Sequence, residues 1–275
     1  MSNSVLIIDF GSQVTQLIAR RIREFGVFCE VKNHDITLDE IKSISPKAII
    51  LSGGPASVYE DGAPTIDRGI FSLKTPILGI CYGQQLICHI LGGKVGEACD
   101  REFGKAEIEL TSNSILFHSL KNKQVWMSHG DRVESIPDGF EVIAKTESAP
   151  FAAISNEDCK IYGVQFHPEV VHSIDGKEIL RSFVQDIAGC ESDWTMKNFK
   201  KEEILEIQKK VGKNQVICGL SGGVDSSVVA VLINEAIGKQ LTCIFVDHGM
   251  LRKDEGNQVR ELFANNFDMN FIHVD

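Results

Sequence analysis

The chain has 275 residues, of which 43% are hydrophobic, and its formal net charge is -10. This length allows two domains that each bury a core, and the acidic balance, without any basic run or aromatic platform, argues against a nucleic-acid surface. No apolar run approaches membrane-spanning length, and the segment from Met1 to Ser4 has no Lys or Arg, unlike a signal peptide. The eight cysteines are scattered without a Cys-x-x-Cys pair, which indicates a reducing cytoplasm.

Short apolar runs alternate with amphipathic segments in the first part of the chain. The runs predict strands at 5–9, 27–31, 47–51 and 77–80. A helix is predicted from Gly11 and Ser12 to Gly26, and the pattern Thr37-x-x-Glu40 predicts a capping box that starts a second helix. This alternation predicts an α/β domain with an open, mostly parallel sheet and helices on both faces.

The strand ending at Ile80 leads into Gly79-Ile80-Cys81-Tyr82-Gly83, which has the sequence shape of a nucleophile elbow. The strand would present the thiol at a sharp turn, and two small glycines would relieve crowding around it. A helix that begins at the sulfur favours thiolate over thiol through its dipole. Cys81 is therefore the candidate nucleophile.

The pattern changes from about residue 105. Short strands are predicted at 107–110, 125–128, 141–144 and 161–165 without long helices between them, which indicates an antiparallel extension of the sheet. A helix over 178–187 closes the unit. The stretch 189–195 breaks the pattern, so we predict a first domain over 1–191 and a second over 192–275.

A nucleophilic cysteine needs a base and a group that orients the base. In Phe166-His167-Pro168-Glu169, Pro168 favours an extended backbone, and alternate residues of an extended segment point to the same side. His167 and Glu169 can therefore project together. A solvated loop is the alternative explanation of the motif. His129 is the rival base, and we prefer His167 for its adjacent carboxylate and its place in the motif.

Two segments could stabilise an oxyanion formed at Cys81. The amide of Tyr82 follows the nucleophile directly. Gly53-Gly54-Pro55 lies at the carboxyl end of a predicted parallel strand, where α/β sheets bind ligands, although such a segment can also be an ordinary turn.

The elbow at Cys81, the Ser52-Gly53-Gly54-Pro55 loop and the Phe166–Glu169 segment together resemble the class I (triad) glutamine amidotransferases, in the family's order. The resemblance implies that Cys81 attacks the side-chain amide of glutamine, that His167 shuttles the proton and that Glu169 orients His167. It further implies that glutamine is held by Gln85, Ser128, His129, Gly130 and Asp131.

A second β-α-β series begins after a polar helix. Strands are predicted at 215–220, 241–246 and 270–274, with helices at 226–237 and 257–267. The first strand enters the glycine loop Ser221-Gly222-Gly223-Val224-Asp225-Ser226-Ser227. Free amides there predict an anion site, but no Lys follows the glycines, so the loop is not a Walker A motif. Asp225 beside phosphate indicates an intervening Mg²⁺, whereas the alternative is a helix start capped by Ser and Asp.

This loop resembles the PP-loop of N-type ATP pyrophosphatases, as does the segment Phe245–Arg252. The resemblance implies ATP with Mg²⁺ as a substrate and no prosthetic group. A series of only three strands predicts an incomplete second α/β domain.

The combination of the two domains resembles the glutamine-hydrolysing GMP synthetase family, including Asp9-Phe10-Gly11-Ser12-Gln13 and Arg101-Glu102-Phe103-Gly104. It implies that ammonia displaces AMP from ATP-activated xanthosine monophosphate, in a family whose homodimerisation region is absent from this sequence. We expect this chain alone to be competent at most for the glutaminase half of that reaction. Two alternatives are a stand-alone cysteine hydrolase of a γ-glutamyl amide and a noncatalytic binding fragment.

Overall fold

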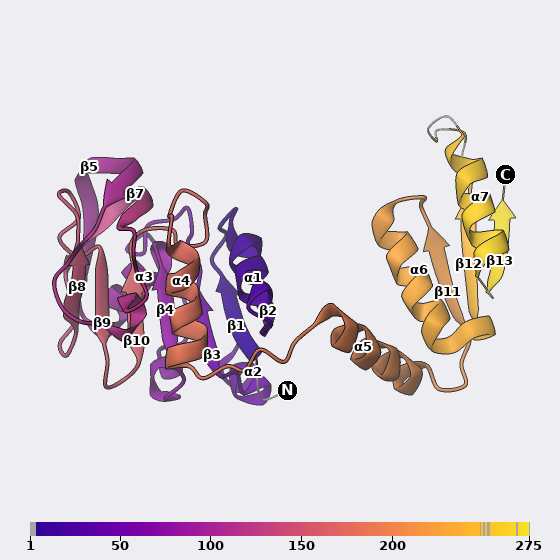
Figure 1. The fold of residues 1–275 in the computed structure, drawn as a ribbon, viewed down its shortest axis with the longest axis horizontal. Coiled ribbons are helices and arrows are strands. Elements are labelled where there is room, and N and C mark those ends of the chain that lie inside the picture. The colour runs from indigo at the N-terminus through magenta and orange to yellow at the C-terminus, as the bar shows by residue number, and fades with distance from the viewer. Residues whose placement is uncertain (1–3, 248, 250, 252–253, 268, 275) are drawn as a thin grey trace. The chain divides into compact units, whose positions relative to one another are not determined.

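The computed structural model describes residues 4–247, 249, 251, 254–267 and 269–274, apart from the side chains of 98–101, 255 and 264–266. The chain divides into two units, Met1–Trp194 and Thr195–Asp275, whereas the sequence predicted a boundary at 191 (Figure 1). Each unit has its own sheet and its own core. No described helix combines the length and apolar character that crossing a lipid bilayer requires.

The first unit is built on an eight-stranded sheet with the order β2-β1-β3-β4-β10-β9-β8-β6. The pairs from β2 to β10 are parallel, and those from β10 to β6 are antiparallel. The predicted open, mostly parallel sheet with an antiparallel extension is therefore confirmed. The strand bounds are β1 Ser4–Asp9, β2 Phe28–Asn33, β3 Ala48–Leu51, β4 Ile77–Ile80, β6 Glu109–Leu110, β8 Glu141–Lys145, β9 Ala153–Asn156 and β10 Ile161–Val164.

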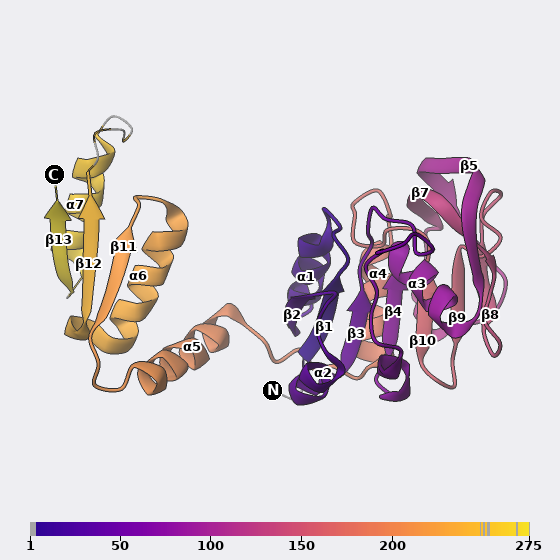
Figure 2. The ribbon, with the colours of Figure 1, turned by 180° about the vertical axis from the view of Figure 1, so that it is seen from behind.

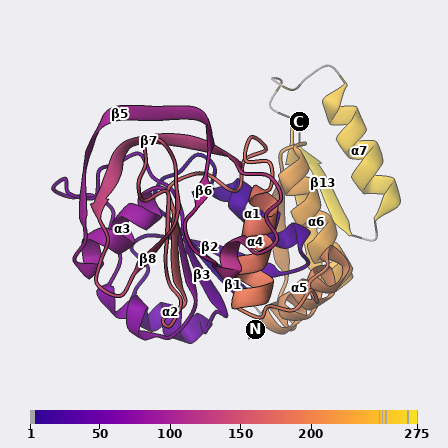
Figure 3. The ribbon, with the colours of Figure 1, turned by 60° about the vertical axis from the view of Figure 1, so that its left-hand side comes forward.

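The membership of the antiparallel extension differs from the prediction. β10 pairs in parallel with β4, and β9, which was not predicted, begins the extension. The predicted strand 125–128 belongs instead to β7 (Gln124–Ser135), which forms a separate ribbon with β5 (Lys94–Glu107) beside α3 (Figure 3). The prediction missed most of β5 because its Gly, Asp, Glu and Lys residues are depleted in strands.

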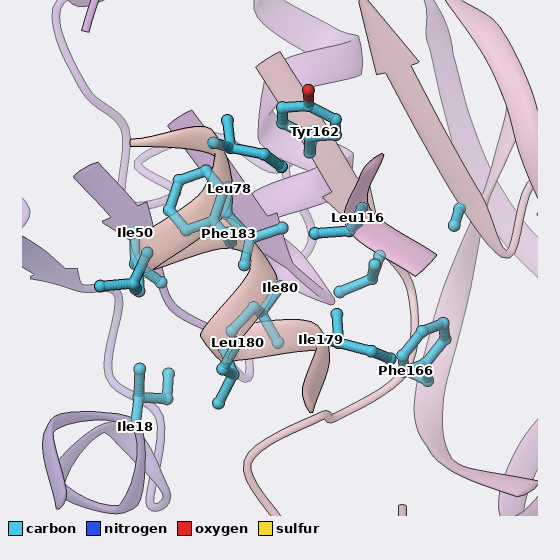
Figure 4. Packing of buried hydrophobic residues seen from close by; sticks show 14 of the residues in the cluster. Ile18, Ile50, Leu78, Ile80, Leu116, Tyr162, Phe166, Ile179, Leu180 and Phe183 are labelled. Carbon is cyan, nitrogen blue, oxygen red and sulfur yellow. The ribbon is translucent and has the colours of Figure 1, made fainter. Parts of the chain in front are cut away.

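Helices cover both faces of this sheet, as predicted (Figures 1 and 2). One apolar cluster joins alternate strand residues such as Ile50 and Leu78 to Ile18 and Leu180 of the helices (Figure 4). The other cluster uses the opposite strand faces. The helix bounds are α1 Thr15–Glu24, α2 Leu38–Ile44, α3 Tyr82–Leu91 and α4 Gly176–Arg181, with short helices η1 Arg68–Ser72, η2 Ile115–Phe117 and the π-helical η3 Ser182–Ile187.

Two helix starts depend on side-chain hydrogen bonds. The predicted capping box is confirmed at α2, where Thr37 and Glu40 each accept the other's backbone amide. The helix predicted to open at Gly11 begins only at Thr15. The reason is that Gly11 has a φ of 90° and that Asp9 Oδ1 accepts the amides of Gly11 and Ser12, which turns the chain before α1.

The second unit contains a three-stranded parallel sheet with the order β11-β12-β13. The elements are α5 Met196–Val211, β11 Val216–Leu220, α6 Val224–Ile237, η4 Gly238–Gln240, β12 Leu241–Val246, α7 Glu255–Asn266 and β13 Asn270–Val274. One sheet face is packed with Cys243, Phe245 and helix residues, whereas the other carries Ile217, which is 72% exposed, and Ile272, which is 47% exposed. His248, Met250 and Arg252 of the predicted nucleotide segment lie outside the described residues.

Candidate active site

Cys81 lies at a sharp, strained turn between β4 and α3. Its φ of 52° and ψ of -105° place an L-residue in the left-handed half of backbone space, which costs about 1–3 kcal/mol. Its amide donates to Val164 O at 2.7 Å, which ties the turn to the neighbouring strand β10. The residue is buried, with 6% of its surface exposed.

The two glycines around Cys81 are required by close backbone approach. A Cβ on Gly79 would lie 2.5 Å from the carbonyl carbon of Gly83, and a Cβ on Gly83 would lie 2.4 Å from Leu51 O. Both distances are shorter than real Cβ contacts. The glycines therefore allow the strand, the turn and α3 to pack as an elbow.

His167 and Glu169 follow β10, the parallel neighbour of β4, so they reach the same edge of the sheet as Cys81. His167 Nδ1 lies 2.8 Å from Glu169 Oε1. The Glu169 side chain is fully buried, and the His167 side chain is 10% exposed. The arrangement fixes the imidazole ring through a carboxylate that water does not reach.

The surroundings of His167 favour its protonated form. Burial lowers the pKa of the imidazole. Hydrogen bonding to Cys81 and Glu169 and the negative charges of these two groups outweigh the effect of burial, and together they raise the pKa of His167 to about 10. At neutral pH His167 therefore carries a proton that it can donate.

The backbone of His167 is held from β7. Its amide donates to Trp126 O at 3.0 Å, and its carbonyl accepts from Ser173 Oγ at 2.6 Å. Ser173 Oγ in turn accepts the amide of Trp126 at 3.0 Å. Sequence reasoning did not single out Ser173, since a lone Ser in a loop gives no signal.

Gly53 and Gly54 follow β3 and approach the catalytic candidates closely. A Cβ on Gly53 would lie 3.3 Å from His167 Cε1, and a Cβ on Gly54 would lie 2.7 Å from Phe10 O. Tyr82 begins α3 directly after Cys81, and its hydroxyl donates to Pro64 O at 2.5 Å. The structure thus brings both oxyanion candidates beside Cys81 and His167.

Cys81 opens onto a larger hollow of about 660 Å³. Gln85 and the segment Ser128–Asp131 line it, so these five glutamine-binding candidates lie together. Gln85 Nε2 donates to Asp131 O at 2.9 Å, and the Tyr59 hydroxyl donates to Asp131 Oδ1 at 3.0 Å. The acidic side chains around this hollow suit a ligand that carries a positive group.

His129, the rival base, has a different partner. Its Nε2 lies 3.4 Å from Glu102 Oε2 of β5, and its side chain is 3% exposed. Burial lowers the pKa of His129, and Glu102 opposes this only in part. His129 therefore remains neutral at neutral pH, unlike His167. The side chain of Arg101, which precedes Glu102, lies outside the described residues.

Gln165 is a site residue that sequence reasoning missed. Its Nε2 donates to Cys81 Sγ at 3.7 Å, and its Oε1 accepts from Gln85 Nε2 at 3.4 Å. The alternation that paired His167 with Glu169 also places residue 165 on the same side of an extended chain. That rule, applied one step further back, could have found it.

In the second unit, Ser221–Gly223 join β11 to α6, and Val224–Ser227 of the predicted glycine loop form the first turn of α6, which begins two residues before the predicted start at 226. Gly223 begins α6 without a side-chain cap, while the hydroxyls of Ser226 and Ser227 donate to Gly223 O at 3.2 Å and 2.8 Å. The serines thus brace the loop and leave the amides at the start of the helix for an anion. Asp225 is exposed, and no group of three potential metal-binding side chains lies within the described part of the chain.

Comparison with known families matches both units. The glutamine amidotransferase class-I family matches residues 6–187, and the NAD synthase family matches residues 196–275. The chain is 54% identical to the GMP synthase [glutamine-hydrolyzing] of Bartonella henselae, covering 100% of this chain and 54% of the relative. It is 56% identical to that of Staphylococcus epidermidis, covering 98% and 53%. The chain thus spans about half the length of these curated relatives.

A solved structure resembles most of the chain. It is the crystal structure of a protein from Thermoplasma acidophilum that is named as a putative GMP synthase subunit, and it has a TM-score of 0.62 and 29% sequence identity. The likeness covers 76% of this chain and 98% of that one.

Proposed function

The chain belongs to the class-I glutamine amidotransferase family, and on this premise we propose that it hydrolyses the side-chain amide of glutamine at Cys81. The observation that carries the proposal is a strained, buried thiol that lines one hollow together with His167, itself 2.8 Å from a fully buried Glu169. This is the constellation that nucleophilic catalysis by cysteine requires.

The reaction proceeds in two stages. The Cys81 sulfur attacks the amide carbon, His167 donates its proton to the nitrogen, and the C–N bond breaks to release ammonia. Water then attacks the γ-glutamyl thioester, His167 takes its proton, and the C–S bond breaks to release glutamate. The amides of Tyr82 and of the Gly53–Gly54 loop stabilise the oxyanion in both stages.

Glutamine binds in the larger hollow beside Cys81. Its α-ammonium group suits the acidic lining, where Asp131 is held by Gln85 and Tyr59. Ser128, His129 and Gly130 form the strand edge along which the side chain reaches the sulfur.

We propose that the second unit binds ATP at Ser221–Ser227. The anion nest at the start of α6 suits the pyrophosphate, and Asp225 offers one carboxylate to a Mg²⁺ that arrives with the nucleotide. The names of the relatives support GMP synthesis as the use of the ammonia. The resemblance to the GMP synthetase family implies that the acceptor is xanthosine monophosphate activated by adenylylation. The seven described cysteines are unpaired, which supports a cytoplasmic setting.

The direct test is release of glutamate and ammonia from glutamine by the whole chain and by two variants. Cys81→Ser is expected to lower kcat by about 10⁴-fold or more, as losses of a nucleophile do. Cys159→Ser, at an exposed cysteine, is the matched control and retains wild-type turnover. Turnover in Cys81→Ser equal to wild type excludes the proposal, and glutamine binding without turnover in wild type favours a binding fragment.

A further inference from the structure

Cys81 opens onto a second hollow besides the one assigned to glutamine. It measures about 330 Å³ and is lined by residues 11–14, Trp126, His167 and Val170. Gly54, Pro55, Cys81 and Ser128 border both hollows. The thiol therefore lies at the junction of two cavities.

The catalytic groups are divided between these cavities. His167 lines only the smaller hollow, whereas Gln85, Gly130 and Asp131 line only the larger one. Substrate recognition is thus on one side of the sulfur and the proton donor is on the other.

Both ammonia and the hydrolytic water must contact His167 during the reaction. The leaving nitrogen takes the imidazole proton, and the hydrolytic water later returns one to it. During the second step the glutamyl group lies in the larger hollow, which His167 does not line, so we expect the water that His167 activates to arrive from the smaller hollow. The smaller hollow has room for several waters, each of which takes about 30 Å³ in the liquid.

The wall of the smaller hollow is braced by Asp9. Its Oδ1 accepts the amides of Gly11 and Ser12 at 3.0 Å and 3.2 Å and the hydroxyl of Thr15 at 2.7 Å. Ser12 Oγ accepts the amide of Val14 at 3.2 Å. This part of the Asp9–Gln13 segment therefore forms a fixed rim rather than a loose loop.

From this division we infer that the smaller hollow is the port of the glutaminase site, through which ammonia leaves and water enters. The inference rests on the proposed function. In the first step the C–N bond breaks and ammonia departs past His167 while the thioester remains. In the second step the water oxygen bonds to the acyl carbon, its proton passes to His167, and the C–S bond breaks to regenerate the thiolate.

The test fills the port with Val170→Trp and compares it with Val171→Trp, whose parent side chain is 73% exposed and does not line the hollow. Three quantities are measured: labelling of Cys81 by a diazo-ketone analogue of glutamine, glutamate release, and acid-trapped thioester from labelled glutamine. For Val170→Trp we expect labelling within about twofold of wild type, glutamate release lowered at least about tenfold, and accumulated thioester. Val171→Trp is expected to match wild type in all three.

Added amines give a second readout. Hydroxylamine and the bulkier O-methylhydroxylamine compete with water for the thioester, and Val170→Trp is expected to disfavour the bulkier one more than wild type does. Gln13→Trp, at another residue that lines the hollow, repeats the test if Val170→Trp does not fold. Wild-type turnover in folded Val170→Trp and Gln13→Trp, or equal slowing of labelling and turnover, overturns the port. Absence of labelling in wild type instead overturns the proposed function.

Discussion

The reactivity proposed for Cys81 depends on a few close contacts around its backbone and its sulfur. Its backbone is strained at a φ of 52°, and this conformation is held by a hydrogen bond from its amide to Val164 O and by two glycines that admit no Cβ. The neighbouring imidazole owes its proton to Glu169 and Cys81. Each of these contacts can be altered by a single substitution.

We expect the carboxylate of Glu169 to set the alkaline limit of activity. Its removal in Glu169→Gln lowers the pKa of His167 from about 10, by roughly 1–3 units for the loss of an adjacent charge. Since the imidazolium must donate to the leaving nitrogen, the alkaline limb of the kcat profile moves to lower pH. An alkaline limb at the same pH in wild type and in Glu169→Gln would refute this role of Glu169.

The same proton links stability to pH. Because the pKa of His167 is raised in the folded chain, its stabilising effect is complete below the ordinary value of 6.5 and is lost as the pH rises through about 10. The free energy of unfolding of wild type is therefore expected to fall more steeply between pH 7 and 10 than that of Glu169→Gln. Urea titrations at four pH values measure the difference.

A Cβ at Gly83 is expected to destabilise the elbow. In Gly83→Ala the methyl group would meet Leu51 O at 2.4 Å, and the backbone must shift, at a cost of about 1–3 kcal/mol. Gly130→Ala is the control for stability, since a Cβ there meets nothing within 4 Å. Urea denaturation compares the two, and equal losses would show that crowding at the elbow is not the cause.

The sequence predicted most of the site, because the elbow at Cys81, the glycine loop and the His-x-Glu motif each require particular residues at fixed spacing along the chain. Gln165 follows the same alternation as His167 and Glu169, so the sequence could have revealed it, whereas Ser173 was missed because its role arises from contacts with β7 that no local pattern encodes. The two hollows likewise exist only once β1, β4, β7 and β10 have been brought together.

At the scale of elements, buried parallel strands were the most predictable and the β5–β7 ribbon the least. β4 matches its predicted bounds because four apolar residues between turn signals leave little choice. β5 lacks such a run and contains a bulge, so its pairing with β7 is set by tertiary contacts. The ribbon nevertheless carries Ser128, His129 and Asp131 to the site.

The capping box of α2 offers a test at this scale. Thr37→Ala removes the side-chain acceptor at the helix start and is expected to lower the free energy of unfolding by about 1 kcal/mol. Ser43→Ala, an exposed position in the same helix, is expected to change it by less than about 0.5 kcal/mol. Chemical denaturation measures both, and a loss no larger at Thr37 than at Ser43 would contradict the role of the cap.

At the scale of the whole molecule, the chain contains two units with separate cores. The triad, both hollows and the oxyanion candidates all lie before Trp194. The PP-loop lies in the other unit, on a three-stranded sheet with one apolar face exposed. Parallel sheets usually have both faces covered, so we expect the first unit to fold on its own more readily than the second.

Residues 1–194 alone are therefore expected to fold and to keep the reactivity of Cys81. The labelling rate with the diazo-ketone analogue should lie within about threefold of that of the whole chain, because no group of the site is removed. Circular dichroism checks the fold. A folded first unit that is not labelled would show that the second unit is needed to assemble the site.

The central claim is that Cys81 is a nucleophile for the side-chain amide of glutamine. Peptide mass spectrometry after treatment of the whole chain with the diazo-ketone analogue tests it most directly. We predict one adduct per chain, located on Cys81, slowed by glutamine and absent from Cys81→Ala. An adduct on another cysteine, or labelling of Cys81 that glutamine does not slow, would contradict the account.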